Sequence, residues 1–196
     1  MVVMADTSGS MYGRPMCTSV GLAMYFAERN TGPYKDTFMT FSSKPSFVTL
    51  KGDTLFEKVK CVPSIIDNTN IKAAFDEILS VAIDNKISAE EVPKALVIIS
   101  DMEFDNCSPD ARKKMTFYDI VKAEYARHGY ELPNVIFWNV DSRQNVFHAF
   151  SDYKGVQLAS GNSPSVFLSI MKNIGLNPVE AMTNVLNNPV YNCITV

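Results

Sequence analysis

Potential zinc ligands are scarce in this sequence. It contains only two histidines, His128 and His148, and neither they nor the four cysteines follow the spacing of a zinc site. No C-x-x-C pair occurs, so we expect reduced thiols and no disulfide framework. Cys17 and Cys61 fall in apolar or amphipathic segments, where a thiol packs as a small hydrophobic group. Both histidines are isolated, and we expect them at the surface or in local hydrogen bonds.

Long apolar runs and an excess of positive charge are also missing. No run approaches the roughly 18 apolar residues that a membrane span requires, and no charged-then-apolar leader precedes the first strand. The formal net charge is −3, whereas a domain that binds nucleic acid usually carries a clustered basic face. The only basic cluster is residues 112–114. These absences predict a cytoplasmic domain that contacts neither a membrane nor nucleic acid directly.

Common catalytic motifs are absent as well. The chain has no G-x-x-x-x-G-K-[ST] loop, no G-x-S-x-G elbow and no G-x-G-x-x-G turn. What it does have is an ordinary globular composition, with 46% hydrophobic and 20% charged residues in 196 positions. We therefore expect one domain and no enzyme. Because the chain begins almost directly on an apolar strand, we also expect a domain excised from a longer protein, with Met1 an added start.

Strands and helices alternate along the chain. Apolar or β-branched runs predict strands at 2–4, 36–41, 45–50, 95–99, 135–140 and 155–159. Apolar residues at helical spacing predict helices at 14–29, 55–59, 69–83, 117–127, 164–174 and 178–186, with Thr116, Ser163 and Asn177 as caps before the last three. Trp138 falls inside a strand and is expected in the core. This order predicts an α/β fold with a doubly wound, mostly parallel sheet, one antiparallel edge strand and helices on both faces.

Oxygen-bearing side chains follow two of the apolar strands. The first strand leads into Asp6, Ser8 and Ser10, and the strand at 95–99 leads into Ser100 and Asp101. Thr69 supplies a further hydroxyl at the start of an amphipathic segment. Parallel α/β sheets bind ligands outside the carboxyl ends of their strands. Oxygen donors are the ligands that Mg²⁺ and Mn²⁺ prefer, so this edge is a candidate site for a divalent metal.

The set Asp6-x-Ser8-x-Ser10, Thr69 and Asp101 resembles the metal-ion-dependent adhesion site of von Willebrand factor A (vWA) domains, in order and in strand context. The resemblance spans nearly the whole chain and implies the strand order 3-2-1-4-5-6, with the Asp6 and Asp101 strands side by side. It implies that the three hydroxyls bind Mg²⁺, or Mn²⁺ or Ca²⁺, directly. The two aspartates would bind the ion directly or through water.

A cation held mainly by hydroxyls and water keeps much of its charge. The resemblance therefore implies a protein-interaction module that binds an exposed Asp or Glu of a partner through the metal. Glu103 and Asp105 lie beside the site and are expected to form a solvated loop. Asp141 ends the next strand and is expected to lie too far away to join the site.

Two other functions are compatible with the sequence. Residues 100–105 and 188–191 are similar to the A domains at the C-terminal end of Ro-type RNA-binding proteins and their uncharacterised relatives, which implies a structural module of an RNA-protein particle. The other is a magnesium-dependent, phosphatase-like hydrolase with Asp6 as nucleophile. Such enzymes usually carry a second acid two residues after the nucleophile, where this chain has Ser8.

Overall fold

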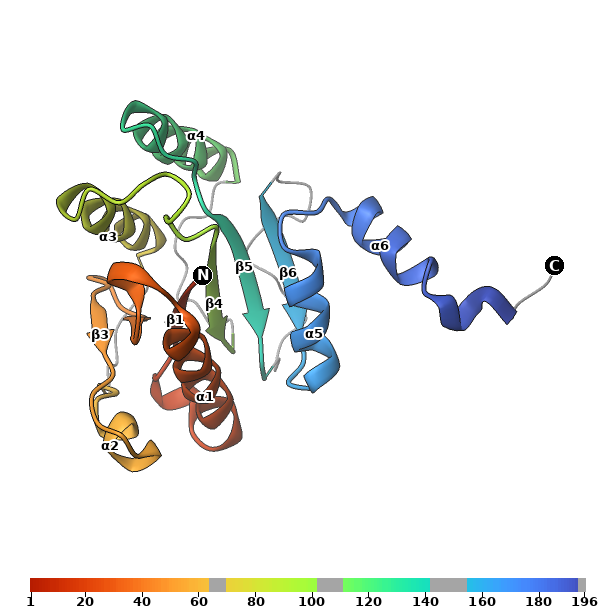
Figure 1. The fold of residues 1–196 in the computed structure, drawn as a ribbon, viewed down its shortest axis with the longest axis horizontal. Helices are drawn as coiled ribbons and strands as arrows, with labels where there is room; N and C mark the ends of the chain where they lie inside the picture. The colour runs from red at the N-terminus through yellow and green to blue at the C-terminus, as the bar shows by residue number, and fades with distance from the viewer. Residues whose placement is uncertain (64–69, 102–110, 142–154, 194–196) are drawn as a thin grey trace.

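The structure is a computed structural model that describes residues 1–63, 70–101, 111–141 and 155–193 (Figure 1). The strands are β1 (Val2–Ala5), β2 (Thr37–Thr40), β3 (Phe47–Thr49), β4 (Ala95–Ser100), β5 (Asn134–Asn139) and β6 (Val156–Ser160). The α-helices are α1 (Arg14–Arg29), α2 (Leu55–Lys60), α3 (Ile71–Asp84), α4 (Ala111–Arg127), α5 (Pro164–Asn173) and α6 (Pro178–Leu186). Three 3₁₀ turns complete the described elements: η1 (Gly9–Met11), η2 (Gly32–Tyr34) and η3 (Pro189–Cys193).

The six strands form one sheet in the order β3-β2-β1-β4-β5-β6. Every neighbouring pair is parallel except β2 and β3, which form an antiparallel edge. This confirms the predicted α/β fold and its strand order. The central position of β1 and β4 follows from their composition, because strands that are apolar at every position need cover on both faces.

Successive strand residues face opposite layers of helices. Val2 and Met4 of β1 pack with α3 and α4, whereas Val3 and Ala5 pack with α1 and α5. The same alternation holds along β4 and β5, as the period of two in a strand requires. Trp138 follows the pattern and is 1% exposed, which confirms its place in the core.

Most predicted helix boundaries are correct to within two residues, and α1 matches its predicted range. The predicted start of α4 at Thr116 is wrong, because the helix begins at Ala111. The segment before Thr116 reads Ala-Arg-Lys-Lys-Met, and these residues favour a helix more strongly than one threonine favours a cap. The caps at Ser163 and Asn177 are confirmed, since their side chains accept hydrogen bonds from the backbone of Val166 and Glu180.

Cys17 differs from the sequence-based expectation. It is exposed on α1 and is not packed as a hydrophobic residue. It stands six residues before Ala23, which is fully buried against the sheet. Six residues correspond to about 120° around a helix of 3.6 residues per turn, so Cys17 points away from the sheet.

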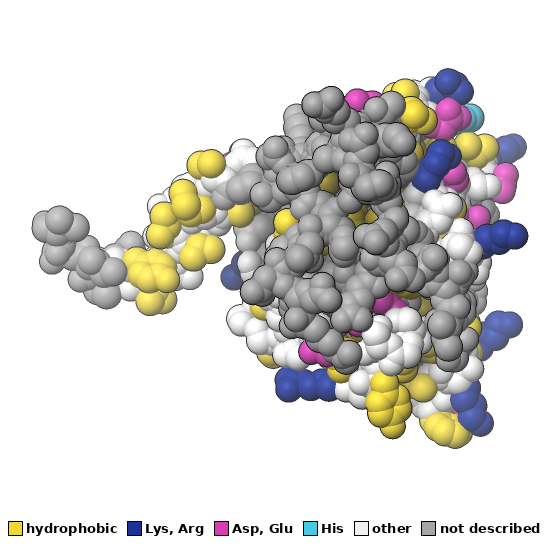
Figure 2. All heavy atoms as spheres, turned by 180° about the vertical axis from the view of Figure 1, so that it is seen from behind, with side chains coloured by type: hydrophobic (Ala, Val, Ile, Leu, Met, Phe, Trp, Pro, Cys, Tyr) yellow, Lys and Arg dark blue, Asp and Glu magenta, His cyan; other side chains and the backbone are white. Residues whose placement is uncertain are grey.

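Helix α6, the last α-helix of the chain, projects from the body of the domain (Figure 1). Its hydrophobic side chains are mostly outside the core, and Val179 and Met182 are 65% and 55% exposed. Figure 2 shows hydrophobic side chains gathered along this projecting segment. In the described part of the chain, no helix has both the length and the apolar character needed to span a membrane.

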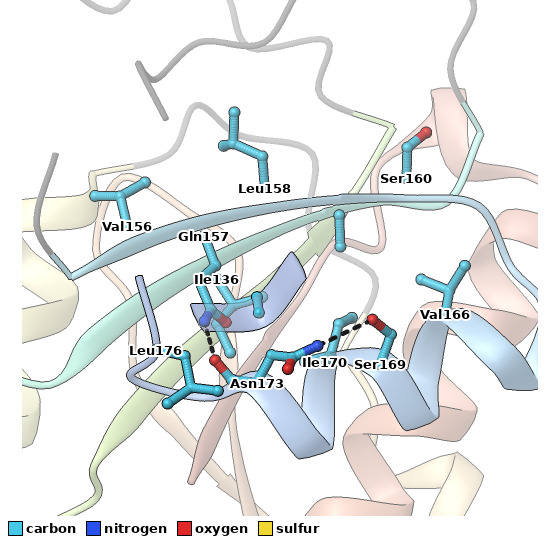
Figure 3. A pocket seen from close by; sticks show the side chains of 12 residues that line it. Ile136, Val156, Gln157, Leu158, Ser160, Val166, Ser169, Ile170, Asn173 and Leu176 are labelled. Atoms are coloured by element: carbon cyan, nitrogen blue, oxygen red, sulfur yellow. Dashed lines mark hydrogen bonds between the residues drawn. The ribbon is translucent and has the colours of Figure 1, made fainter. Parts of the chain in front are cut away.

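A cavity of about 420 Å³ lies between β6 and α5 at the edge of the sheet (Figure 3). Apolar side chains such as Ile136, Val166 and Ile170 make up most of its lining. At its polar end, the side-chain amide of Gln157 donates to the carbonyl oxygen of Asn173. The sheet edge beneath α5 therefore carries a mainly apolar pocket that is open to solvent.

Candidate metal site

The pairing of β1 with β4 brings Asp6 and Asp101 to the same edge of the sheet. Ala5 pairs with Ile99, and the backbone N–H of Asp6 donates to the carbonyl oxygen of Ile99 over 3.1 Å. Asp6 follows Ala5 and Ser100 follows Ile99, so Asp6 and Ser100 lie beside each other at the end of this strand pair. Both aspartates are buried, with exposed fractions of 2% for Asp6 and 4% for Asp101.

The turn after Asp6 is ordered by its own side chains. Asp6 Oδ1 accepts a 2.9 Å hydrogen bond from the backbone N–H of Ser8. This bond is typical of an aspartate that begins a turn. The chain then forms η1, and fully buried Met11 holds that turn against the core.

The same turn brings two hydroxyl groups together. Ser8 Oγ and Ser10 Oγ lie 3.1 Å apart and share a hydrogen bond. Two oxygen atoms at this separation can both contact one cation at the 2.0–2.1 Å ligand distance typical of Mg²⁺.

Ser100 links the two carboxylates. Its hydroxyl donates to Asp6 Oδ2 over 2.6 Å and lies 3.5 Å from Asp101 Oδ1, where any sharing of the same proton is weak. The sequence alone did not predict a role for Ser100 itself. Its position could have indicated a role in the site. Ser100 closes β4 directly before Asp101, and it lies beside Asp6 once β1 and β4 are paired.

Burial gives the Asp6 carboxyl an unusual electrostatic environment. Desolvation raises the pKa of Asp6, and the charge of Asp101 raises it further. Hydrogen bonds from Ser100 and Ser8 act in the opposite direction but do not cancel the effect of burial. A cation placed between these oxygen atoms would offset the charge of both carboxylates, so the donor set fits a divalent metal.

The predicted site residues fall into two groups. The structure brings Asp6, Ser8, Ser10 and Asp101 together around the ends of β1 and β4. Thr69 lies outside the described residues, as do Glu103 and Asp105. Asn70, the first described residue after Thr69, donates from its backbone N–H to the carbonyl oxygen of Ser42.

Other candidate metal ligands are not gathered elsewhere in the described ranges. No group of three or more His, Cys, Asp or Glu side chains there could hold a metal ion. The set at β1 and β4 contains only two acids, and its remaining oxygen donors are hydroxyls. His128 lies at the surface in the turn directly after α4, where its Nε2 is 3.5 Å from Glu124 Oε1, as expected for an isolated histidine.

Comparison with known proteins gives a family and one relative. The profile of a family described as "Domain of unknown function (DUF7788)" matches residues 1–188. The chain is also 32% identical over 198 aligned positions to "Uncharacterized protein L728" of Acanthamoeba polyphaga mimivirus. The alignment covers 97% of this chain and 34% of the viral protein, so the chain spans about a third of that relative's length.

Proposed function

The chain belongs to the DUF7788 family, and we propose that it is a vWA-like module that binds a divalent cation where β1 and β4 end. The ligands in this proposal are Asp6, Ser8, Ser10, Thr69 and Asp101. Mg²⁺ is the proposed ion, with Mn²⁺ or Ca²⁺ as substitutes. The cation in turn binds an exposed Asp or Glu of a partner protein.

The observation that carries the proposal is the buried contact network of Asp6, Ser100 and Asp101. Two carboxylates beside each other in a buried site repel, and a shared cation is a common way for proteins to offset that cost. The neighbouring Ser8 and Ser10 hydroxyls supply neutral oxygen donors on the same side. Together they support a site for a hard cation with few charged ligands.

The small number of charged ligands also supports the proposed partner. Two carboxylates neutralise a divalent ion only when both are ionised and in contact with it. Hydroxyl oxygens are neutral and neutralise little of the charge of a bound metal ion. A carboxylate from a partner protein would therefore bind the ion favourably. We therefore propose recognition of an acidic side chain and not catalysis by this site.

Metal binding is tested by thermal unfolding in EDTA and after addition of Mg²⁺, Mn²⁺ or Ca²⁺. At about 100 times the Kd, binding to the folded state stabilises it by about 2.7 kcal/mol, which corresponds to roughly 5–10 °C in Tm. The Asp6→Ala variant should lose the shift, whereas Glu90→Ala, on an exposed turn, should keep it. Absence of any metal response in the intact protein contradicts the proposal.

Catalysis is distinguished by a second measurement. A phosphatase-like hydrolase would turn over a generic phosphate ester in Mg²⁺, and Asp6→Asn would abolish that turnover because it removes the nucleophile. We expect no turnover in either protein. Turnover that disappears in Asp6→Asn would favour the hydrolase instead.

A further inference from the structure

A surface groove begins beside the candidate metal site and runs between α1 and α2. It has a volume of about 490 Å³ and is lined on one side by Met16, Val20 and Met24 of α1. Leu55 and Val59 of α2 line the other side. Most of this lining is apolar, although the groove opens to solvent.

The groove is continuous with the turn that carries the metal ligands. Thr7 lines one end of the groove and stands in the sequence between Asp6 and Ser8. Its hydroxyl donates a 3.1 Å hydrogen bond to the carbonyl oxygen of Pro63, which closes the same end. A chain segment bound at the cation would therefore have the groove as its immediate neighbour.

Helix α2 presents apolar side chains that the domain itself does not bury. Leu55 and Phe56 are 72% and 69% exposed, and no residue of this helix is buried. An exposed apolar surface of this kind is typical of an interaction site. The helix is nevertheless well fixed, because Thr54 and Glu57 form a capping box at its start.

An ion pair holds the two walls of the groove together. Lys58 of α2 lies 2.5 Å from Glu28 of α1, measured from Nζ to Oε1. Both groups respond to the contact, since it lowers the pKa of Glu28 and raises the pKa of Lys58. This exposed ion pair bridges α1 and α2 and weakly favours the arrangement in which the two helices flank the groove.

The charges on α2 favour an acidic partner. Glu57 is the only acid of the helix, and its carboxylate is occupied by the backbone N–H groups of Asp53 and Thr54. Lys60 lies over the ring of Phe56, 4.3 Å from its centroid, and keeps its positive charge at the surface. Helix α2 therefore offers apolar contacts inside the groove through Leu55 and Val59, and a cation, Lys60, on its exposed surface outside the groove.

We propose that the partner is a peptide segment in which an Asp or Glu has large apolar side chains within a few residues of it. The carboxylate binds the cation and the apolar side chains occupy the groove between α1 and α2. This inference rests on the proposed function, because the cation fixes the acidic end of the segment.

The test uses short synthetic peptides with one fixed glutamate and randomised neighbours, selected for binding to the wild-type chain in Mg²⁺. We expect enrichment of Leu, Ile, Met or Phe at fixed distances from the glutamate. The double variant Leu55→Ser and Val59→Ser should weaken binding of the selected peptides by about tenfold or more. The control Leu168→Ser changes a 54% exposed residue of α5 and should leave peptide binding unchanged.

Thermal unfolding with Mn²⁺ on the same variants separates the two proposals. The groove variant should keep the full metal-dependent shift in Tm, because neither substitution touches a ligand. Wild-type protein without a metal shift overturns the proposed function and this inference with it. If the wild type does show the metal-dependent shift in Tm, the proposed function stands and only this inference is at risk. It is overturned if no peptide is enriched, if the enriched peptides show no apolar preference, or if the groove variant binds them like the wild type. It is also overturned if sedimentation shows a dimer that the groove variant abolishes, because the occupant would then be a second copy.

Discussion

Ser100 donates a 2.6 Å hydrogen bond to Asp6 across 94 positions of sequence, and both residues are buried. The other carboxylate oxygen of Asp6 accepts from the backbone N–H of Ser8. A carboxylate can accept about four hydrogen bonds or metal contacts, so each oxygen retains capacity for another partner. The two bonds therefore orient Asp6 and still leave it able to contact a cation or a metal-bound water.

The raised pKa of Asp6 predicts a pH dependence in the metal-free protein. A buried acid with a raised pKa binds its proton more tightly in the folded state than in the unfolded one. Its contribution to stability is thus fully present below the unfolded pKa near 3.8 and is lost as the pH rises through the folded pKa. In EDTA, the Asp6→Asn variant should gain stability relative to the wild type as the pH rises from about 3.8 through the folded pKa of Asp6.

Urea unfolding across this pH range, in EDTA, measures the effect. The matched control is Asp84→Asn, because Asp84 lies at the exposed end of α3. A stability difference for Asp6→Asn that does not change with pH would contradict the raised pKa.

The Ser10 hydroxyl is expected to matter for the metal and little for the fold. Ser10→Ala removes a proposed ligand and one hydrogen bond to Ser8. Loss of one partly buried hydrogen bond costs about 1 kcal/mol, whereas removal of a group near a metal typically lowers affinity by about tenfold or more. Calorimetric titration with Mn²⁺ should show the weaker binding, and Ser80→Ala on the exposed side of α3 should not. Equal Mn²⁺ affinity in Ser10→Ala and wild type would remove Ser10 from the ligand set.

Gly52 is required by the loop that starts α2. It has a φ of +98°, and a Cβ placed there would lie 2.4 Å from Cβ of Glu57. Gly52→Ala should therefore destabilise the protein by about 1–3 kcal/mol, because it strains the backbone and displaces the capping glutamate.

Gly21 of α1 is the matched control for Gly52. A Cβ at this position meets no atom within 4 Å, and alanine favours a helix by about 1 kcal/mol over glycine. Thermal unfolding should therefore show opposite signs for Gly21→Ala and Gly52→Ala. A destabilised Gly21→Ala, or a Gly52→Ala as stable as the wild type, would contradict this account of the loop.

Tyr125 connects α4 to α3 through a buried hydroxyl. Its side chain is fully buried, and the hydroxyl donates a 2.8 Å hydrogen bond to the carbonyl oxygen of Phe75. Burial raises the pKa of Tyr125, so the group stays neutral through the physiological range. Tyr125→Phe should lower stability by about 1 kcal/mol, or about 2–4 °C in Tm, whereas Tyr12→Phe at an 87% exposed position should have no effect. Equal Tm values for the two variants would contradict the role of this bond.

The local sequence pattern determined most of the fold and three of the five proposed metal ligands. The apolar run of β4 and the helical spacing along α1 and α3 depend on neighbouring residues only, so their structure could be predicted from the sequence. Asp6, Ser8 and Ser10 share one turn, and their closeness follows from that turn. The strand order came from the resemblance to vWA domains, and the structure confirms it.

Contacts between distant segments required the tertiary structure. Ser100 reaches Asp6 only because the register of β1 and β4 sets Ala5 beside Ile99. The groove between α1 and α2 and the exposed position of Cys17 likewise depend on which helix face the sheet covers. Periodicity identifies an apolar face, but the packing of several elements decides which face is buried and which surface is left for a partner.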